Sequence, residues 1–258
     1  MQLNYKIYGA ENSDVIIILH GLFGMLDNWT TLAKRFAQTH RVYAIDLRNH
    51  GKSVHTKEMN YNVMAMDLKD FMVNESIYTA NIIGHSMGGK VLMTFTNLYP
   101  EYVERMVVVD IAPKAYKPKH NQIIDALTSL PIQSLKTREQ ADNWLSNNIT
   151  QASVRLFLLK NLARTKLGFE WKMNLPVIIE NYSEIIGDVD IKNGFERPVL
   201  MLYGGNSDYL SNDDFKELEL FYDNVRFKEI EDAGHWVHAE KPDAFYENVI
   251  EFLNESLY

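Results

Sequence analysis

The residue pattern with the clearest chemistry is a G-x-S-x-G sequence at residues 84–88, whose serine is Ser86. It follows a strand-like apolar run at 81–83 and precedes a helical pattern that continues to residue 98. A turn this tight between strand and helix leaves no room for side chains two residues either side of the serine, which explains both glycines. The serine hydroxyl then projects beside a helix N-terminus that favours developing negative charge. The pattern predicts a nucleophilic serine rather than a glycine-rich turn with an incidental one.

A second glycine-containing loop, HGLFG at residues 20–24, follows the first buried strand pattern. Its glycines would let the backbone approach a substrate carbonyl. We expect two backbone amides to bind the oxyanion of a tetrahedral intermediate: Met87 N–H and Leu22 N–H, with Phe23 N–H as the alternative to Leu22. His20 is expected to brace this loop rather than to act as a base.

The predicted base is His235, which stands in a short loop after a late strand pattern at 225–230. This loop would place its imidazole at the same sheet edge as Ser86, where it would accept the serine proton and return it to the leaving group. His238 completes an H-x-x-H pattern, but no third ligand accompanies it, so no metal site is predicted.

Two aspartates compete for the acid that orients the histidine. Asp110 ends one aliphatic strand pattern, and Asp208 follows the next one in the core. Asp110 is favoured because a carboxylate at the end of so apolar a strand is costly without a partner such as an imidazole N–H. Its other interpretation is capping of the following proline-containing turn. With Asp110 as the acid, Ser207 is expected to touch the His235 ring as a secondary partner.

These residues need a scaffold, and the rest of the chain supplies one. Short apolar runs alternate with helical patterns, which predicts an α/β fold with a mostly parallel central sheet flanked by helices. Strands are expected at 3–8, 15–19, 41–45, 80–83, 106–109, 199–202 and 225–230. Helix starts are predicted at Asn62, at a capping box formed by Ser211 and Asp214, and at Pro242 in a first turn.

The alternation of strand and helix patterns stops after the strand that ends at Asp110. Residues 113–188 hold helical patterns at 121–130, 137–147, 151–163 and 176–186 and no convincing strand. We expect an all-helical lid inserted between two parts of a core, 1–112 and 189–258. The lid residues that would enclose an acyl chain, or merely attach the lid, are Trp144, Leu156, Phe157, Leu159, Trp171 and Met173.

The amino-acid composition excludes several classes of chemistry and of partner. The chain has 258 residues, no cysteine and a formal net charge of −8, so thiol nucleophiles and cysteine-ligated metals are excluded and nucleic-acid partners are not expected. The N-terminus shows no secretory pattern, and the aliphatic runs are only strand-sized, which predicts a soluble cytoplasmic protein without membrane insertion. No cofactor is predicted, and the sequence does not indicate an oligomeric state.

Eight segments together are more specific than the serine motif alone: HGLFGMLDN, DLRNHGKS, GHSMGGK, DIAP, FLLK, NLPV, GGNS and GHWVHAEKPD. With them the chain resembles the α/β-hydrolase superfamily, and within it the YbfF-type bacterial esterases, over essentially its whole length. The resemblance implies a carboxylesterase or acyl thioesterase with Ser86, Asp110 and His235 as its triad, and it favours Asp110 over Asp208.

The sequence therefore predicts a serine hydrolase that cleaves short- to medium-chain acyl esters or thioesters through an acyl-enzyme. Two alternatives stay open. One is a carbon–carbon bond hydrolase or lyase on the same fold, and the other is a non-catalytic binding protein on a hydrolase scaffold.

Overall fold

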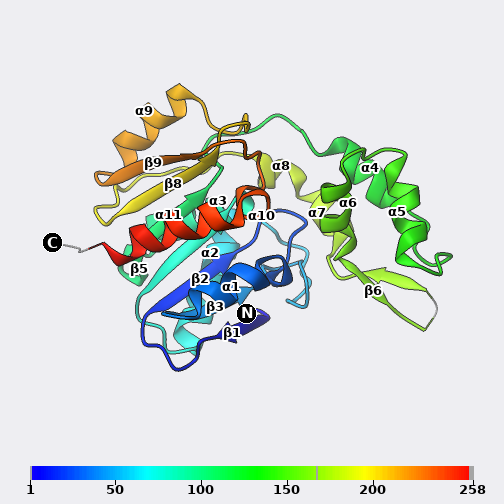
Figure 1. The fold of residues 1–258 in the computed structure, drawn as a ribbon, viewed down its shortest axis with the longest axis horizontal. Coiled ribbons are helices and arrows are strands. Elements are labelled where there is room, and N and C mark those ends of the chain that lie inside the picture. The colour runs from blue at the N-terminus through cyan, green and yellow to red at the C-terminus, as the bar shows by residue number, and fades with distance from the viewer. Residues whose placement is uncertain (1, 167, 256–258) are drawn as a thin grey trace.

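The computed structural model of the protein describes residues 2–166 and 168–255. Within them, a seven-stranded sheet has the order β1-β3-β2-β4-β5-β8-β9 (Figure 1). Strand β1 is antiparallel to β3, and the other neighbouring pairs are parallel. The strands are Tyr5–Tyr8 (β1), Val15–Leu19 (β2), Arg41–Ile45 (β3), Ala80–His85 (β4), Val103–Val109 (β5), Val199–Gly204 (β8) and Val225–Ile230 (β9). The predicted mostly parallel sheet is confirmed.

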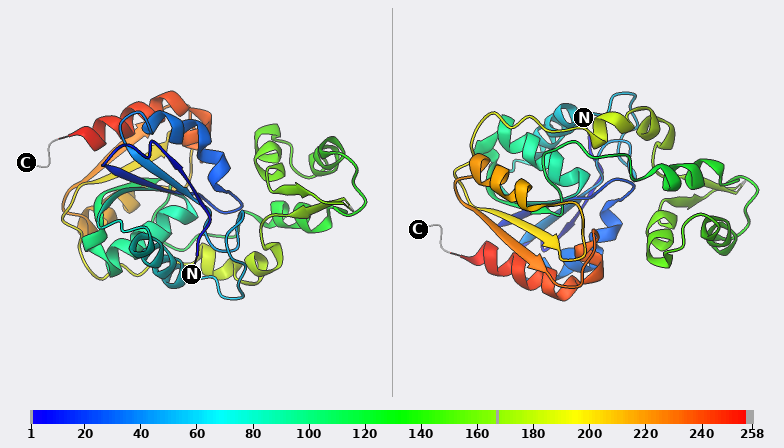
Figure 2. Two further views of the ribbon diagram at one scale, coloured as in Figure 1. Left: turned by 90° about the horizontal axis from the view of Figure 1, so that it is seen from below. Right: turned by 90° about the horizontal axis from the view of Figure 1, so that it is seen from above.

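Helices cover both faces of the sheet because its central strands, β2, β4 and β5, are mostly apolar and bury both of their faces. Figure 2 shows α1 and α11 on one side of the sheet and α2 and α3 on the other. The helices of the core are α1 (Thr30–Phe36), α2 (Tyr61–Asn74), α3 (Met87–Leu98), α9 (Asn212–Phe221), α10 (Val237–Glu240) and α11 (Pro242–Asn254), with 3-10 turns at Leu26–Trp29 and Pro100–Tyr102. The two faces form separate hydrophobic clusters, which hold the sheet rigid between them.

The helix N-termini show which of the predicted capping residues are correct. The capping box of Ser211 and Asp214 is present, and Pro242 occupies the first turn of α11, as predicted. The predicted cap Asn62 is wrong, because it lies inside α2. Asn60 caps that helix instead, accepting a hydrogen bond from Val63 N at 3.0 Å. Both asparagines suit a cap chemically, and only Asn60 has the extended backbone that a cap requires.

We call residues 113–188 the cap; it lies at one end of the core (Figure 1). Its elements are α4 (Asn121–Ser129), α5 (Arg138–Ser146), α6 (Ala152–Leu159), β6 (Leu162–Arg164), β7 (Phe169–Trp171), α7 (Leu175–Glu180) and α8 (Tyr182–Ile186). The prediction of an all-helical insertion is wrong, because β6 and β7 pair as an antiparallel ribbon. Strands of three residues are too short to produce a recognisable alternation.

The same ribbon corrects the helix boundaries predicted in the cap. The helix expected over 151–163 ends at Leu159, and its last residues enter β6. The helix expected over 176–186 is two helices, α7 and α8, separated at Asn181. Of the six apolar residues singled out in the cap, Trp144 and Leu156 are exposed and the other four are buried or half-buried.

The sheet topology determines where chemistry is concentrated. The carboxyl ends of parallel strands meet at one edge of the sheet, where ligands bind in open α/β sheets. That edge receives Ser86 after β4, Asp110 after β5, the loop 20–24 after β2 and His235 in the loop after β9.

Candidate active site

Ser86 stands at the turn from β4 into α3 in a conformation that side chains rarely adopt. Its φ is 51° and its ψ is −118°. A Cβ atom at Gly84 would lie 2.4 Å from Gly88 O, and one at Gly88 would lie 2.5 Å from Leu19 O. The collisions expected from the motif are thus real, one with the helix start and one with the neighbouring strand. Strain of this kind costs about 1–3 kcal/mol and persists only where the surrounding structure enforces it.

A continuous chain of hydrogen bonds joins Ser86, His235 and Asp110. Ser86 Oγ lies 3.0 Å from His235 Nε2, and His235 Nδ1 lies 2.7 Å from Asp110 Oδ2. Burial lowers the pKa of the His235 imidazole well below its usual value, which keeps the ring neutral at pH 7. A neutral imidazole with Nδ1–H on the carboxylate presents Nε2 to the serine as an acceptor, the arrangement needed to remove its proton.

Asp110 is fully buried, so its carboxylate depends on local donors. Ser207 Oγ donates to Oδ2 at 2.5 Å, and Gly204 N donates to Oδ1 at 3.2 Å. Burial raises the pKa of the Asp110 carboxyl to about 6, against these hydrogen bonds, which lower it. Ser207 is therefore placed differently from the sequence expectation: its hydroxyl binds the carboxylate rather than the His235 ring, because it lies in the turn after β8, directly beside the end of β5.

The competing acid, Asp208, makes no hydrogen bond to His235 in the described part of the chain. Its side chain is 79% exposed and pairs with Lys119 at 2.6 Å. The hydrogen bond from Lys119 lowers the pKa of Asp208, as expected for an exposed carboxylate with a cation beside it. Of the two aspartates, the structure brings only Asp110 into contact with His235.

The loop at 20–24 and the start of α3 hold the amides expected to bind the oxyanion. Phe23 N donates to His50 Nε2 at 3.3 Å, so the amide that sequence alone left as the alternative donor is already engaged. In the described part of the chain, neither Leu22 N–H nor Met87 N–H donates a hydrogen bond to a protein atom. Both residues line the cavity that contains Ser86. These two amides are free to bind an oxyanion there.

His20 braces the loop, as expected. Its Nε2 accepts a hydrogen bond from Leu47 N at 3.0 Å, and its Nδ1 lies 2.8 Å from Gly21 O. Burial lowers the pKa of His20 to about 4, so the ring stays neutral and keeps one donor and one acceptor. The ring therefore joins the ends of β2 and β3, and both of its nitrogens are engaged there.

Sequence reasoning missed a ring stacked on His235 and a hydrogen bond to the His235 backbone. The Tyr209 ring stacks on His235 with 3.7 Å between centroids and 13° between planes. His85, the residue before the nucleophile, has Nε2 2.9 Å from the carbonyl oxygen of His235. Tyr209 directly follows the GGNSD segment and His85 lies within the serine motif, but nothing in their spacing indicates these tertiary contacts.

Lys90 was also missed. It lies one turn beyond Ser86 on α3, is 1% exposed and lines the same cavity. Its Nζ donates to Lys114 O at 2.7 Å and to Gly187 O at 2.5 Å. Burial lowers the pKa of Lys90 to about 8. One ammonium group thus ties both ends of the cap to the helix that carries the nucleophile.

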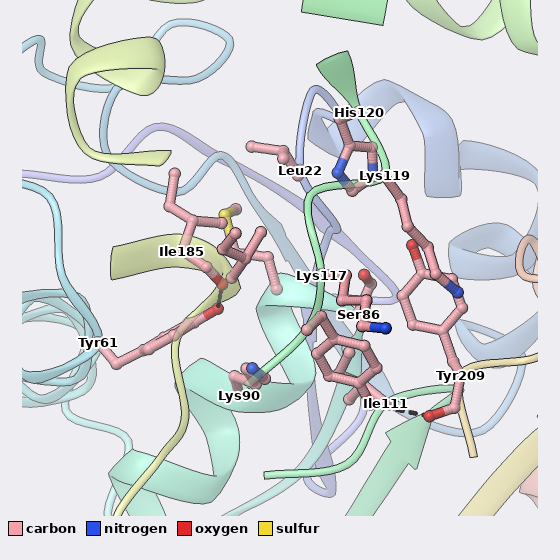
Figure 3. A pocket seen from close by; sticks show the side chains of 13 residues that line it. Leu22, Tyr61, Ser86, Lys90, Ile111, Lys117, Lys119, His120, Ile185 and Tyr209 are labelled. Carbon is pink, nitrogen blue, oxygen red and sulfur yellow. Dashed lines mark hydrogen bonds between the residues drawn. The ribbon is translucent and has the colours of Figure 1, made fainter. Parts of the chain in front are cut away.

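Two cavities meet at Ser86. The first, of about 390 Å³, is partly polar, and Figure 3 shows Ser86 within it, with Lys90 and Tyr61 to one side and Tyr209 to the other. The second, of about 340 Å³, is lined by the polar residues His85, Ser86, His120 and His235 and by the apolar residues Leu22, Phe23, Ile123, Val154, Phe157, Leu158 and Trp236. Of the cap residues singled out from sequence, only Phe157 lines this second cavity.

Fold and site together define a class: a hydrolase of the alpha/beta hydrolase fold, whose family model matches residues 14–242. The chain belongs to this family, and the expected resemblance to YbfF-type esterases is confirmed. It is 37% identical to esterase YbfF of Escherichia coli K12, covering 99% of this chain and 100% of that protein. It is 37% identical to the sn-1-specific diacylglycerol lipase ABHD11 of Danio rerio, covering 98% of this chain and 83% of that protein.

Comparison with solved structures supports the same family. A marine microorganism esterase superposes with a TM-score of 0.94 at 37% identity, covering 97% of this chain and 99% of that one. Together these relatives support an ester hydrolase. Among the helices of residues 2–166 and 168–255, none combines the length and apolar character needed to cross a membrane.

Proposed function

We propose that the protein hydrolyses carboxylic esters or thioesters of short- to medium-chain acyl groups through an acyl-enzyme on Ser86, without a metal or cofactor. One observation carries the proposal: the hydroxyl of Ser86 lies 3.0 Å from a neutral imidazole that Asp110 orients, in a cavity also lined by Leu22 and Met87, whose amides have no protein partner in the described chain. No other serine in the described chain has this combination of neighbours.

In the first half-reaction, His235 Nε2 removes the Ser86 proton as Oγ attacks the carbonyl carbon. Leu22 N–H and Met87 N–H hold the resulting oxyanion, and His235 then protonates the departing alcohol or thiol. In the second half, a water molecule replaces the leaving group, His235 removes its proton, and the acid is released as the serine regains its hydrogen. The enforced turn at Ser86 and the buried hydrogen bonds of Asp110 keep these groups in place between the two steps.

The two cavities would bind different parts of the substrate. We assign the second cavity to the acyl chain, because most of its lining side chains are aliphatic or aromatic, and the first cavity, which three lysines line, to the leaving group.

The deciding experiment is an activity profile across 4-nitrophenyl esters and the matching acyl thioesters of increasing chain length, beside labelling by a fluorophosphonate probe. We expect turnover with short and medium chains and labelling at Ser86. Labelling without turnover of any ester or thioester would favour the carbon–carbon hydrolase or lyase. A protein that is neither labelled nor active would be a binding protein on this scaffold.

Cavity shape gives a prediction about chain length. Phe157 lines the acyl cavity opposite Trp236, with 6.1 Å between ring centroids. Phe157→Ala is expected to raise the ratio of kcat/KM for long over short esters by about tenfold, the discrimination typical of one or two methylenes in an apolar pocket. Leu156→Ala is the matched control, since Leu156 is 63% exposed on the same helix. An unchanged ratio in Phe157→Ala would remove this residue from the acyl site.

The pH profile follows from the raised pKa of Asp110, which burial moves to about 6. Above this pKa the carboxylate accepts the His235 and Ser207 hydrogen bonds. Below it, the protonated acid no longer orients the neutral ring. We therefore expect kcat/KM to be level between about pH 7 and pH 8 and to fall about tenfold per pH unit below about pH 6. Asp208→Asn should leave this limb unchanged, and a level profile down to about pH 4.5 would contradict the assignment.

A further inference from the structure

The loop that carries Leu22 contains a strained residue. Gly24 N donates to Gly21 O at 2.9 Å, which closes a four-residue turn with Leu22 and Phe23 at its centre. Phe23 has φ of 60°, a left-handed conformation that this turn position normally reserves for glycine. A bulky residue stays in this region only where its surroundings hold it there.

Two side chains hold the Phe23 backbone from opposite sides. His50 Nε2 accepts from Phe23 N at 3.3 Å, and Asn161 Nδ2 donates to Phe23 O at 2.6 Å. His50 is fixed as an acceptor, since its Nδ1 faces Arg48 O at 3.0 Å and burial lowers the pKa of the ring to about 3. Phe23, His50 and Asn161 are each at most 2% exposed. Both polar groups of the Phe23 backbone are therefore held by buried partners.

Asn161 comes from the cap, between α6 and β6, so the cap itself supplies one of the two contacts. Its other amide atom, Oδ1, is buried and has no hydrogen-bond partner within residues 2–166 and 168–255. A buried unpaired carbonyl lowers stability, and leucine would fill the same volume without it. Stability alone does not favour asparagine here. The one favourable contact its amide makes is the hydrogen bond to the Phe23 carbonyl.

We propose that Asn161 is a positioning residue for the oxyanion hole: its hydrogen bond to Phe23 O keeps the turn in the shape that presents Leu22 N–H beside Ser86. The inference rests on the proposed function, because it assigns Leu22 N–H to the oxyanion. Asn161 lines neither cavity, so it acts through the backbone of the loop rather than on substrate. Through this hydrogen bond the cap helps to position the oxyanion hole, in addition to covering the site.

The test is Asn161→Leu in the full chain, with 4-nitrophenyl acetate as substrate and an alkyl trifluoromethyl ketone as inhibitor. The adduct of this ketone with Ser86 carries an oxyanion. We expect kcat to fall about 10- to 100-fold with KM within about twofold, since loss of a whole oxyanion donor costs about 10²–10³ and here the donor is only misplaced. Ketone affinity should fall by the same factor. A purely structural residue would change the melting temperature and not this pair of values.

Asn174→Leu is the matched control. It removes another amide contact between cap and core, Asn174 Nδ2 to Asn49 Oδ1 at 3.2 Å, which does not involve Phe23. It should keep kcat and ketone affinity within about twofold of wild type. Should Asn161→Leu not fold, Asn161→Ala carries the same expectation.

Three results would overturn the inference: unchanged kcat in the folded variant, a fall in kcat without weaker ketone binding, or an equal fall in Asn174→Leu. A wild-type protein that turns over no ester would instead overturn the proposed function, and this inference with it. Full wild-type turnover, its loss in Ser86→Ala and an unaffected Asn161→Leu would reject the inference alone.

Discussion

Replacing Ser86 by alanine is expected to lower kcat for 4-nitrophenyl esters by about 10⁶-fold, the loss seen when a serine hydrolase loses its nucleophile. The reason is specific to the site. Ser86 Oγ is the one hydroxyl at hydrogen-bonding distance from His235 Nε2 in the described chain, so no neighbouring group can take its place. A fluorophosphonate probe should label wild type and leave Ser86→Ala unlabelled.

The stability of this variant separates chemistry from folding. Ser86 makes no side-chain cap to α3, and its hydroxyl bonds only to His235. The melting temperature of Ser86→Ala should therefore lie within a few degrees of wild type, because about 1 kcal/mol or less is lost with one such hydrogen bond. Residual turnover above about 1% of wild type, in a preparation free of other esterases, would show that another group attacks the ester.

The sheet was predictable because burial leaves a local signature. Val15–Leu19 is aliphatic at every position; in the structure its edges pair with β3 and β4, and its two faces are buried in the two hydrophobic clusters. Runs of this kind have no other stable place in a globular protein. The short ribbon β6 and β7 leaves no such signature, because three residues give neither a period nor an apolar run, and its pairing depends on the neighbouring cap helices.

The site was predictable to a smaller extent, for a similar reason. Ser86 could be recognised from sequence because the backbone is closely approached at Gly84 and at Gly88. Only glycine fits at these two positions, so their spacing around the serine is visible in the local sequence. Ser207 and Asn161 act through contacts with residues 97 and 138 positions away. Such contacts depend on the packed fold, and the residue type alone leaves several partners open. Strain at Phe23 is likewise invisible before φ is known.

The choice between two aspartates shows how topology completes a sequence argument. Asp110 ends β5, which lies between β4 and β8, so its carboxylate is enclosed by neighbouring strand ends. Asp208 stands four residues beyond the end of β8, where the chain has already left the sheet, and Lys119 of the cap neutralises it at the surface. A carboxylate inside the sheet edge needs a partner, whereas one in solvent does not.

Asp110→Asn is therefore expected to lower kcat about 10⁴-fold, as removal of the acid's charge does in a serine protease. The amide fits the same space, but its NH₂ group would meet the His235 ring or the Ser207 hydroxyl as a donor, which favours the wrong imidazole tautomer. The steady-state kcat of Asp110→Asn is measured beside Asp208→Asn, which changes an equally charged but exposed neighbour. Asp208→Asn should keep kcat within about twofold, because the Lys119 pair is a surface ion pair of small energy. If Asp208→Asn lost its activity and Asp110→Asn kept it, Asp110 would not be the acid. The loop after β8 would then have to move to His235 during catalysis.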